Sequence, residues 1–229
     1  MSSDFYRSFE EKFRGSRELV KSRLQVYLPF VAWLRKVYED IQAVDVGCGR
    51  GEWLELLRES GVDAHGVDLN EGMLDTCRNL GLSVEKCEAV SYVESLSDES
   101  KALITGFHIA EHIPFEDLQN LVQQALRVLQ PAGLLILETP NPENILVGTY
   151  KFYLDPTHQH PLPPQLLAYL PEYYGFHRTK IMYLRESPNP AASKKMKLFS
   201  LFYHVSLDYA VVAQKGAPQE QLKAFNRAF

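Results

Sequence analysis

The spacing of apolar positions changes at about residue 41. Before it, apolar side chains recur every four residues from Val20 to Leu28, which is typical of one helix face, and Ser16 is the predicted N-cap. After it, short apolar runs alternate with amphipathic segments, a pattern typical of a parallel sheet with crossover helices. We therefore predict an N-terminal helical cap or lid over residues 1–40 and a second domain over residues 41–229.

The second domain divides into runs that predict strands and segments that predict helices. Strands are expected at residues 43–46, 63–67, 82–86, 102–109, 134–138 and 176–184, with a last strand within 198–213. Helices are expected at residues 51–60, 71–80, 115–130 and 165–174, and a mobile loop at 187–197. This order predicts an α/β fold with a doubly wound, Rossmann-like, seven-stranded and mostly parallel sheet.

Composition and charge exclude several classes of protein. Charged residues make up 23% and hydrophobic residues 45% of the 229 positions, so the chain is not disordered. The net charge of −5 argues against a nucleic-acid partner. Three cysteines without C-x-x-C spacing argue against a disulfide framework and a thiolate zinc site, and no metal is predicted. Without a signal-peptide pattern or a transmembrane segment, a cytoplasmic protein is expected.

A glycine-rich motif lies where the first predicted strand turns into a helix. The segment Val44-Asp-Val-Gly-Cys-Gly-Arg-Gly51 lets the backbone pass close under a ligand, in front of the free N–H groups of the helix. The second strand ends at Asp68, about 20 residues after Gly47, where an acid can accept both hydroxyls of a ribose. The alternatives are a dinucleotide site, for which the glycine spacing is wrong, and a tight turn without a ligand.

On these residues the chain resembles the class I S-adenosylmethionine (SAM) methyltransferases, whose first motif is D/E-x-G-x-G-x-G. The resemblance extends through Glu88-Ala89, through the run 107–113 with its Glu-His pair, and through residues 129–136, where Ala132 replaces a glycine. It implies SAM as the cofactor and methyl transfer as the activity. The cofactor-binding residues that it implies are Asp45, Gly47, Gly49, Gly51, Asp68, Leu69, Met73, Glu88, Ala89, His108 and Arg14.

The start of the chain resembles the methyltransferase portion of bacterial O-antigen chain-terminating enzymes. Residues 5–24 and 27–30 carry this resemblance, together with Asn-Pro-Glu-Asn at 141–144 and Asp-Pro-Thr-His at 155–158. It implies O-methylation of a terminal phosphate or sugar of a lipopolysaccharide-type glycan, with peripheral association with membrane-bound glycan assembly machinery. One alternative is a small aromatic or quinone-like hydroxyl, because the Glu-His pair also occurs in ubiquinone-pathway O-methyltransferases. A non-catalytic SAM-binding regulatory domain is the second alternative.

Three segments outside the cofactor motifs are candidates for contact with the acceptor. The N-terminal cations suit an anion, or else pair with glutamates on a solvated face. Asn141 lies between two prolines, so its amide is expected to be free for a substrate hydroxyl unless it only forms a turn. Residues 150–160 crowd polar groups beside aromatics; helix capping and a weak metal site are the alternatives. The predicted catalytic residues are His158, His112, Glu111 and Arg17, and the predicted acceptor-binding residues are Arg7, Arg17, Lys21, Asn141, Tyr153, Asp155 and Thr157.

Overall fold

The computed structural model describes residues 12–13, 15–184 and 205–229, so the predicted loop at 187–197 lies outside it. Within these residues the strands are β1 (Gln42–Val46), β2 (Asp63–Asp68), β3 (Val84–Lys86), β4 (Lys101–Phe107), β5 (Leu129–Pro140), β6 (Arg178–Leu184) and β7 (Asp208–Gln214). They form one sheet in the order β3-β2-β1-β4-β5-β7-β6. The first five strands run parallel, and β7 is antiparallel to both β5 and β6. The predicted Rossmann-like, mostly parallel sheet of seven strands is confirmed.

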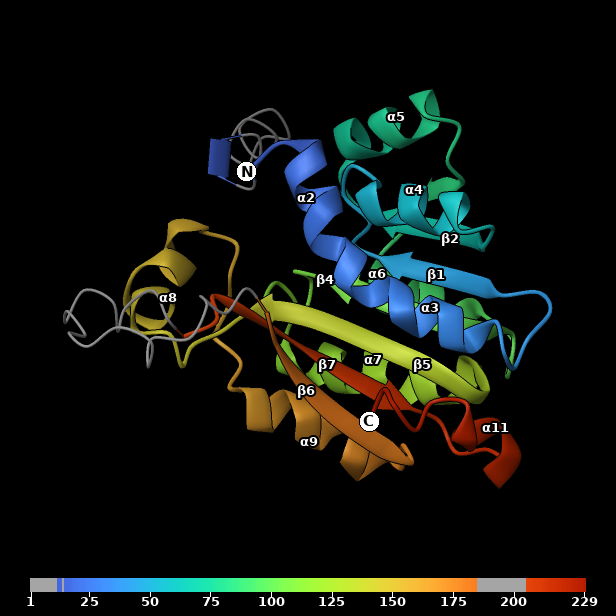
Figure 1. Ribbon diagram of the computed structural model, residues 1–229. Helices are drawn as coiled ribbons and strands as arrows, with labels where there is room; N and C mark the ends of the chain where they lie inside the picture. Colours follow the sequence, from blue (N-terminus) through green and yellow to red (C-terminus); the bar gives the residue numbers. More distant parts are fainter. Residues whose placement is uncertain (1–11, 14, 185–204) are drawn as a thin grey trace, which may run out of the picture.

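Helices cover both faces of this sheet (Figure 1). They are α2 (Arg17–Leu24), η1 (Gln25–Tyr27), α3 (Leu28–Leu34), α4 (Glu52–Glu59), α5 (Glu71–Asn79), α6 (Ala89–Ser95), α7 (Phe115–Val128), α8 (Ile145–Thr149), η2 (Lys151–Leu154), α9 (Pro164–Tyr174) and α11 (Gln219–Lys223). The core on one face includes residues of α2, α3 and α4, and the core on the other includes residues of α6, α7 and α9. Among the described helices, none has the length and hydropathy needed to cross a bilayer.

The N-terminal helices are part of the main core. Val20 and Leu24 are buried in the same cluster as Trp53 of α4 and the inner side chains of β4 and β5. Ser16 caps α2 by accepting the N–H of Leu19, and a 3₁₀ turn separates α2 from α3 at the place where a proline follows. Helix formation in this segment is therefore confirmed, whereas its separation from the rest of the chain as a cap domain stays a prediction.

Several predicted boundaries were wrong, each for a local reason. Strand β4 ends at Phe107 rather than at residue 109, because His108 adopts a left-handed backbone conformation with φ +57°. Helix α7 ends at Val128 and β5 starts at Leu129, because Pro131 disfavours helical torsions at the residue that precedes it. Strand β3 starts two residues later than expected, since the N–H of Leu82 still closes the preceding helix turn onto the Cys77 carbonyl.

The carboxyl ends of the parallel strands meet at one edge of the sheet, where ligands bind in doubly wound folds. Two other segments lie at this edge. Figure 1 shows α8 beyond the carboxyl end of β5, on the same side of the molecule as the start of α2. A site at this edge is therefore flanked by the N-terminal helix and by the α8–η2 segment.

Candidate active site

The loop after β1 has a conformation that requires glycine. Gly47, Gly49 and Gly51 all have left-handed φ values of 68°, 53° and 78°. A Cβ atom on Gly47 would lie 2.8 Å from the Cδ1 atom of Ile109, and one on Gly51 would lie 2.8 Å from the Cys77 sulfur. The loop is therefore packed closely against Ile109 and Cys77, and Gly47 and Cys48 line a cavity on its other side.

Asp68 holds this loop from the neighbouring strand. One carboxylate oxygen accepts the N–H of Gly49 at 2.9 Å, and the other accepts the N–H of Asn70 at 2.8 Å. Leu69 follows it and is 63% exposed, which leaves an apolar side chain accessible beside the carboxylate. A glycine cradle, an acid and an exposed leucine fit the phosphate-free adenosine part of SAM.

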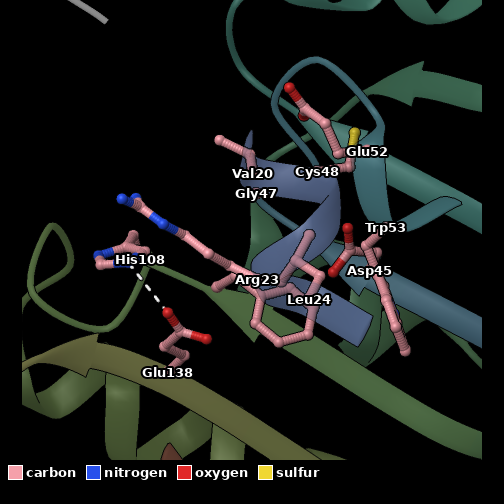
Figure 2. Close-up of a pocket in the computed structure, with 11 residues that line it drawn as sticks. Val20, Arg23, Leu24, Asp45, Gly47, Cys48, Glu52, Trp53, His108 and Glu138 are labelled. Atoms are coloured by element: carbon pink, nitrogen blue, oxygen red, sulfur yellow. Dashed lines mark ion pairs between the residues drawn. The ribbon is translucent and has the colours of Figure 1, made fainter. Parts of the chain in front are cut away.

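A cavity extends from the glycine loop to the ends of β4 and β5 (Figure 2). Asp45 lies in its wall, buried, and accepts the hydroxyl of Thr105 at 2.7 Å. Helix α2 forms the wall opposite the loop, and the Arg23 side chain extends from it toward His108. The lining residues are Val20, Arg23, Leu24, Asp45, Gly47, Cys48, Glu52, Trp53, Phe107, His108 and Glu138.

Four other residues are implied by the resemblance as cofactor-binding. The Glu88 carboxylate caps α6 by accepting the N–H of Ser91 at 2.8 Å, while Ala89 and Met73 are buried. Arg14 lies outside the described residues. For all four residues a contact with SAM stays a prediction.

His108 lies among carboxylates at the point where β4 ends. Its Nδ1 is 3.1 Å from Glu111, and its Nε2 is 3.3 Å from Glu138 and 3.9 Å from Asp208. The second oxygen of Glu138 accepts the hydroxyl of Tyr27 at 2.5 Å. Because Glu138 and Asp208 come from β5 and β7, this His108 cluster joins three strand ends beneath the cavity.

The carboxylates keep this histidine charged at neutral pH. Burial lowers the pKa of His108, but the hydrogen bonds that its ring donates to Glu111 and Glu138 outweigh burial and raise it to about 9. Burial raises the pKa of Glu111, but the contact with His108 outweighs it and lowers that pKa to about 2. The resting state is therefore an imidazolium between two carboxylates.

This charge predicts a pH dependence of folding stability. Because the folded pKa of about 9 exceeds the ordinary 6.5, the stabilisation is complete below pH 6.5 and is lost as the pH rises through 9. At most about 3 kcal/mol of unfolding free energy is involved. Urea unfolding measures the free energy of unfolding at about pH 6 and at about pH 10. Its decrease between these two pH values should be smaller in His108→Asn than in the unmodified protein. Equal losses in the two proteins would contradict this assignment.

A second cavity, of about 290 Å³, adjoins the first and shares His108 and Arg23 with it. Its apolar wall comes from the end of β5, from α8 and from η2. Phe152 is buried there, whereas its neighbour Tyr153 is 64% exposed on the outer side. The lining residues are Phe13, Arg23, His108, Pro140, Val147, Lys151, Phe152, Leu207 and Asp208. Its position beside the glycine-loop cavity makes it the candidate acceptor cavity.

The other predicted catalytic histidines pack behind Phe152. The ring of His158 lies 4.5 Å from that of Phe152 and 4.6 Å from that of His112, measured between centroids. The Nδ1 atom of His158 is 2.6 Å from the Phe152 carbonyl, so it carries the hydrogen of that bond. Neither histidine lines the acceptor cavity described above, and their role as base stays a prediction.

Asp155 and Thr157 orient His112 within this packed segment. The Thr157 hydroxyl donates to Asp155 at 2.6 Å, so it accepts from Nδ1 of His112 at 2.8 Å. Burial lowers the pKa of His112, which keeps the ring neutral. The hydrogen bonds hold residues 152–158 in place; the predicted contacts of Asp155 and Thr157 with the acceptor remain untested.

Two groups in the described part of the chain offer atoms that could ligate a metal. They are Glu111, His112 and His158, and His108, Glu138 and Asp208, with the ligand atoms of each group within 4.8 Å of one another. In the second group both ring nitrogens of His108 already face carboxylates. The geometry is thus accounted for by an ion pair.

The predicted acceptor-binding cations tie α2 to α4. Arg17 contacts Glu55 at 2.7 Å, and Lys21 contacts Glu59 at 2.6 Å. Their partners thus come from α4 rather than from their own segment, and their charges are compensated. Arg7 lies outside the described residues. A direct contact of Arg17 or Lys21 with the acceptor stays a prediction.

The expectation that Asn141 has a free amide is wrong. Its side chain is fully buried, donates to the Ser206 carbonyl at 3.0 Å and accepts the N–H of Glu143 at 3.1 Å. These bonds fix the turn after β5 to the segment before β7. The two prolines made this residue conspicuous, but its amide satisfies backbone groups.

Comparisons with known proteins agree with this geometry. A family described as "Methyltransferase domain" matches residues 22–180. The ubiquinone biosynthesis O-methyltransferase of Methylococcus capsulatus is 36% identical over 107 residues, and that match covers 44% of each chain, under half of the relative. The enzyme of the same name from Bordetella avium is 26% identical over 203 residues, 80% of each chain. The crystal structure of a SAM-dependent methyltransferase from Archaeoglobus fulgidus has 34% identity and a TM-score of 0.79, covering 92% of this chain and 100% of that one.

Proposed function

We propose, from the premise that this chain belongs to the methyltransferase domain family of SAM-dependent enzymes, that it methylates a hydroxyl oxygen on a small aromatic or quinone-like acceptor. The observation that carries this proposal is the place of His108, on the wall shared by the glycine-loop cavity and the acceptor cavity. The apolar walls from Val147 and Phe152 suit a ring. Two relatives named as ubiquinone biosynthesis O-methyltransferases add support.

When bound, SAM supplies a methyl group on a sulfonium, and methyl transfer needs an aligned oxygen nucleophile. Asp68 and the glycine loop hold the cofactor at the strand ends. Glu111 keeps the hydrogen of a neutral His108 on Nδ1, so that Nε2 is left to accept the hydroxyl proton of the acceptor. Glu138, 3.3 Å from Nε2, stabilises the imidazolium that this transfer forms. Because the pKa of His108 is about 9, the fraction of active base rises with pH, reaches one half near pH 9 and approaches completion above it.

A glycan end is the second candidate acceptor. The sequence favours it because Arg17 and Lys21 could bind an anion. In the structure, however, Glu55 and Glu59 compensate the charges of these two residues, which weakens that support. Arg23 and Lys151, which line the acceptor cavity, are cations that could bind a phosphorylated glycan end instead of Arg17 and Lys21. A phosphate monoester needs no base, since it is largely ionised at neutral pH.

A methyl-transfer assay with labelled SAM tests the proposed function. We expect incorporation into catechols and phenols, and none into unphosphorylated mannosides, because only the aromatic compounds fill the apolar part of the cavity. Phosphorylated mannosides form the third arm. Transfer to mannosides alone would favour the glycan acceptor, and SAM binding without transfer to any arm would contradict the aromatic proposal.

A further inference from the structure

The acceptor cavity contains two cationic side chains that come from different elements. Arg23 belongs to α2, and Lys151 is the first residue of η2, more than a hundred positions later in the sequence. Both side chains line the same cavity of about 290 Å³. The fold therefore brings two positive charges from distant parts of the chain to the lining of the space that an acceptor would fill.

These two cations differ from their neighbours in having no acidic partner. Arg17 and Lys21 contact Glu55, and Arg50 contacts Glu52 at 2.9 Å. Within the described ranges 12–13, 15–184 and 205–229, by contrast, the side chains of Arg23 and Lys151 make neither an ion pair nor a hydrogen bond. Two exposed cations that lack an ion-pair partner among the described residues can attract a negative group into this cavity.

The acids of the same region contact His108 and form no ion pair with Arg23 or Lys151 among the described residues. Asp208 faces His108, whose Nε2 lies 3.9 Å away, and Glu138 is closer still to the same ring. These acids thus lie against the imidazolium on the strand side of the cavity. The side chain of Arg23 extends from α2 toward that cluster (Figure 2). An anion between Arg23 and Lys151 would join the N-terminal helix to η2 across the cavity.

We infer that the acceptor carries a carboxylate or phosphate group, which Arg23 and Lys151 bind while the ring rests on Val147, Phe152 and Leu207. This inference rests on the proposed function and narrows its substrate class to anionic hydroxyl compounds. The guanidinium of Arg23 suits either anion with two parallel hydrogen bonds, and the Lys151 ammonium adds a point charge. A hydroxylated aromatic acid and a phosphorylated sugar share this chemistry.

Matched substrates and variants separate the anion from the rest of the acceptor. The probes are 3,4-dihydroxybenzoate against catechol, and a phosphomannoside against the same mannoside without phosphate. The variants are Lys151→Met and Arg23→Met, with Lys36→Met as a control that removes one exposed cation outside the cavity. Labelled SAM measures kcat and KM, calorimetry measures SAM affinity, and thermal unfolding confirms that each variant is folded.

We expect each cavity variant to raise the KM for the anionic probe at least about tenfold, and to raise the KM for its neutral counterpart much less. If the cavity variants raise the KM for dihydroxybenzoate, the acceptor carries a carboxylate. If they raise the KM for the phosphomannoside, the acceptor carries a phosphate. Lys151→Met should also leave SAM affinity unchanged, because Lys151 is absent from the lining of the glycine-loop cavity.

Three results would overturn the inference. Lys151→Met and Lys36→Met could have the same KM values, catechol could be methylated as efficiently as its acid, or Arg23→Met could weaken SAM binding and nothing else. In each case methylation of catechol would leave the proposed function standing. Failure of the proposed function is distinct: no probe is methylated by SAM-bound protein, the mannosides alone are methylated, or mass spectrometry finds the methyl group on the carboxylate.

Discussion

Replacing His108 with asparagine is expected to lower kcat for a phenolic acceptor by about two to four orders of magnitude. Asparagine tolerates the left-handed torsion of this position, where φ is +57°, so the variant is expected to fold. It keeps a polar group beside Glu111 and Glu138 but provides no nitrogen lone pair that can accept a proton. Steady-state turnover with labelled SAM measures the loss.

The pH profile shows whether the loss concerns proton transfer. In the unmodified protein kcat should rise with pH with a midpoint near pH 9 and level off above it, because the pKa of His108 is about 9 and only the neutral ring is a base. The residual rate of His108→Asn should lack that rise. The control variants are His112→Gln and His158→Gln, which alter rings behind Phe152. If His158→Gln abolished the titration instead, the base would be His158 and the assignment to His108 would be wrong.

Replacing Asp68 with alanine is expected to weaken SAM binding at least about tenfold, because a charged hydrogen bond contributes about 1.5–3 kcal/mol. Two losses combine in this variant. The carboxylate would no longer accept the ribose hydroxyls, and the N–H groups of Gly49 and Asn70 would lose the oxygens that fix them. The dissociation constant of SAM, measured by calorimetry, reports the sum of these effects.

Asp63→Ala is the matched control for this measurement. Asp63 starts the same strand at its opposite end, is exposed, and accepts a hydrogen bond from Gln42 at 2.9 Å. Its removal should leave SAM affinity unchanged, and thermal unfolding should be cooperative in both variants. If a folded Asp68→Ala protein bound SAM with full affinity, the proposal that Asp68 binds the ribose of SAM would be wrong.

The sheet was predictable because its signals are local. Apolar runs give the strands, and the glycine motif between Val44 and Gly51 marks the first turn, since left-handed torsions and close packing there admit no side chain. The short helices α6, α8 and α11 were missed, because five to seven residues are too few to show a helical period. The periodicity of the chain therefore predicts the scaffold better than the segments that connect it.

The walls of the site were less predictable because they depend on distant partners. Arg17 and Arg23 are both cations of α2, and nothing in their local sequence shows that Glu55 compensates one and that a cavity receives the other. His108 was expected to contact the cofactor. Its proposed role as a base follows from its place on the wall shared by two cavities, and Glu138, 30 residues later in the sequence, helps to raise its pKa. Ion pairs between such distant residues arise from the topology of the fold, and the spacing of residues along the sequence does not reveal them.

The hydrogen bond from Tyr27 to Glu138 has a consequence for biosynthesis. It joins residues 111 positions apart and closes a core in which the first helices pack on the middle of the sheet. A ribosome adds about 5–20 residues per second, so α2 and α3 are exposed for several seconds before β5 exists to bury them. The apolar side chains of these helices are thus available to chaperones during synthesis. The long loop that must close before they are covered makes this contact a late step in folding.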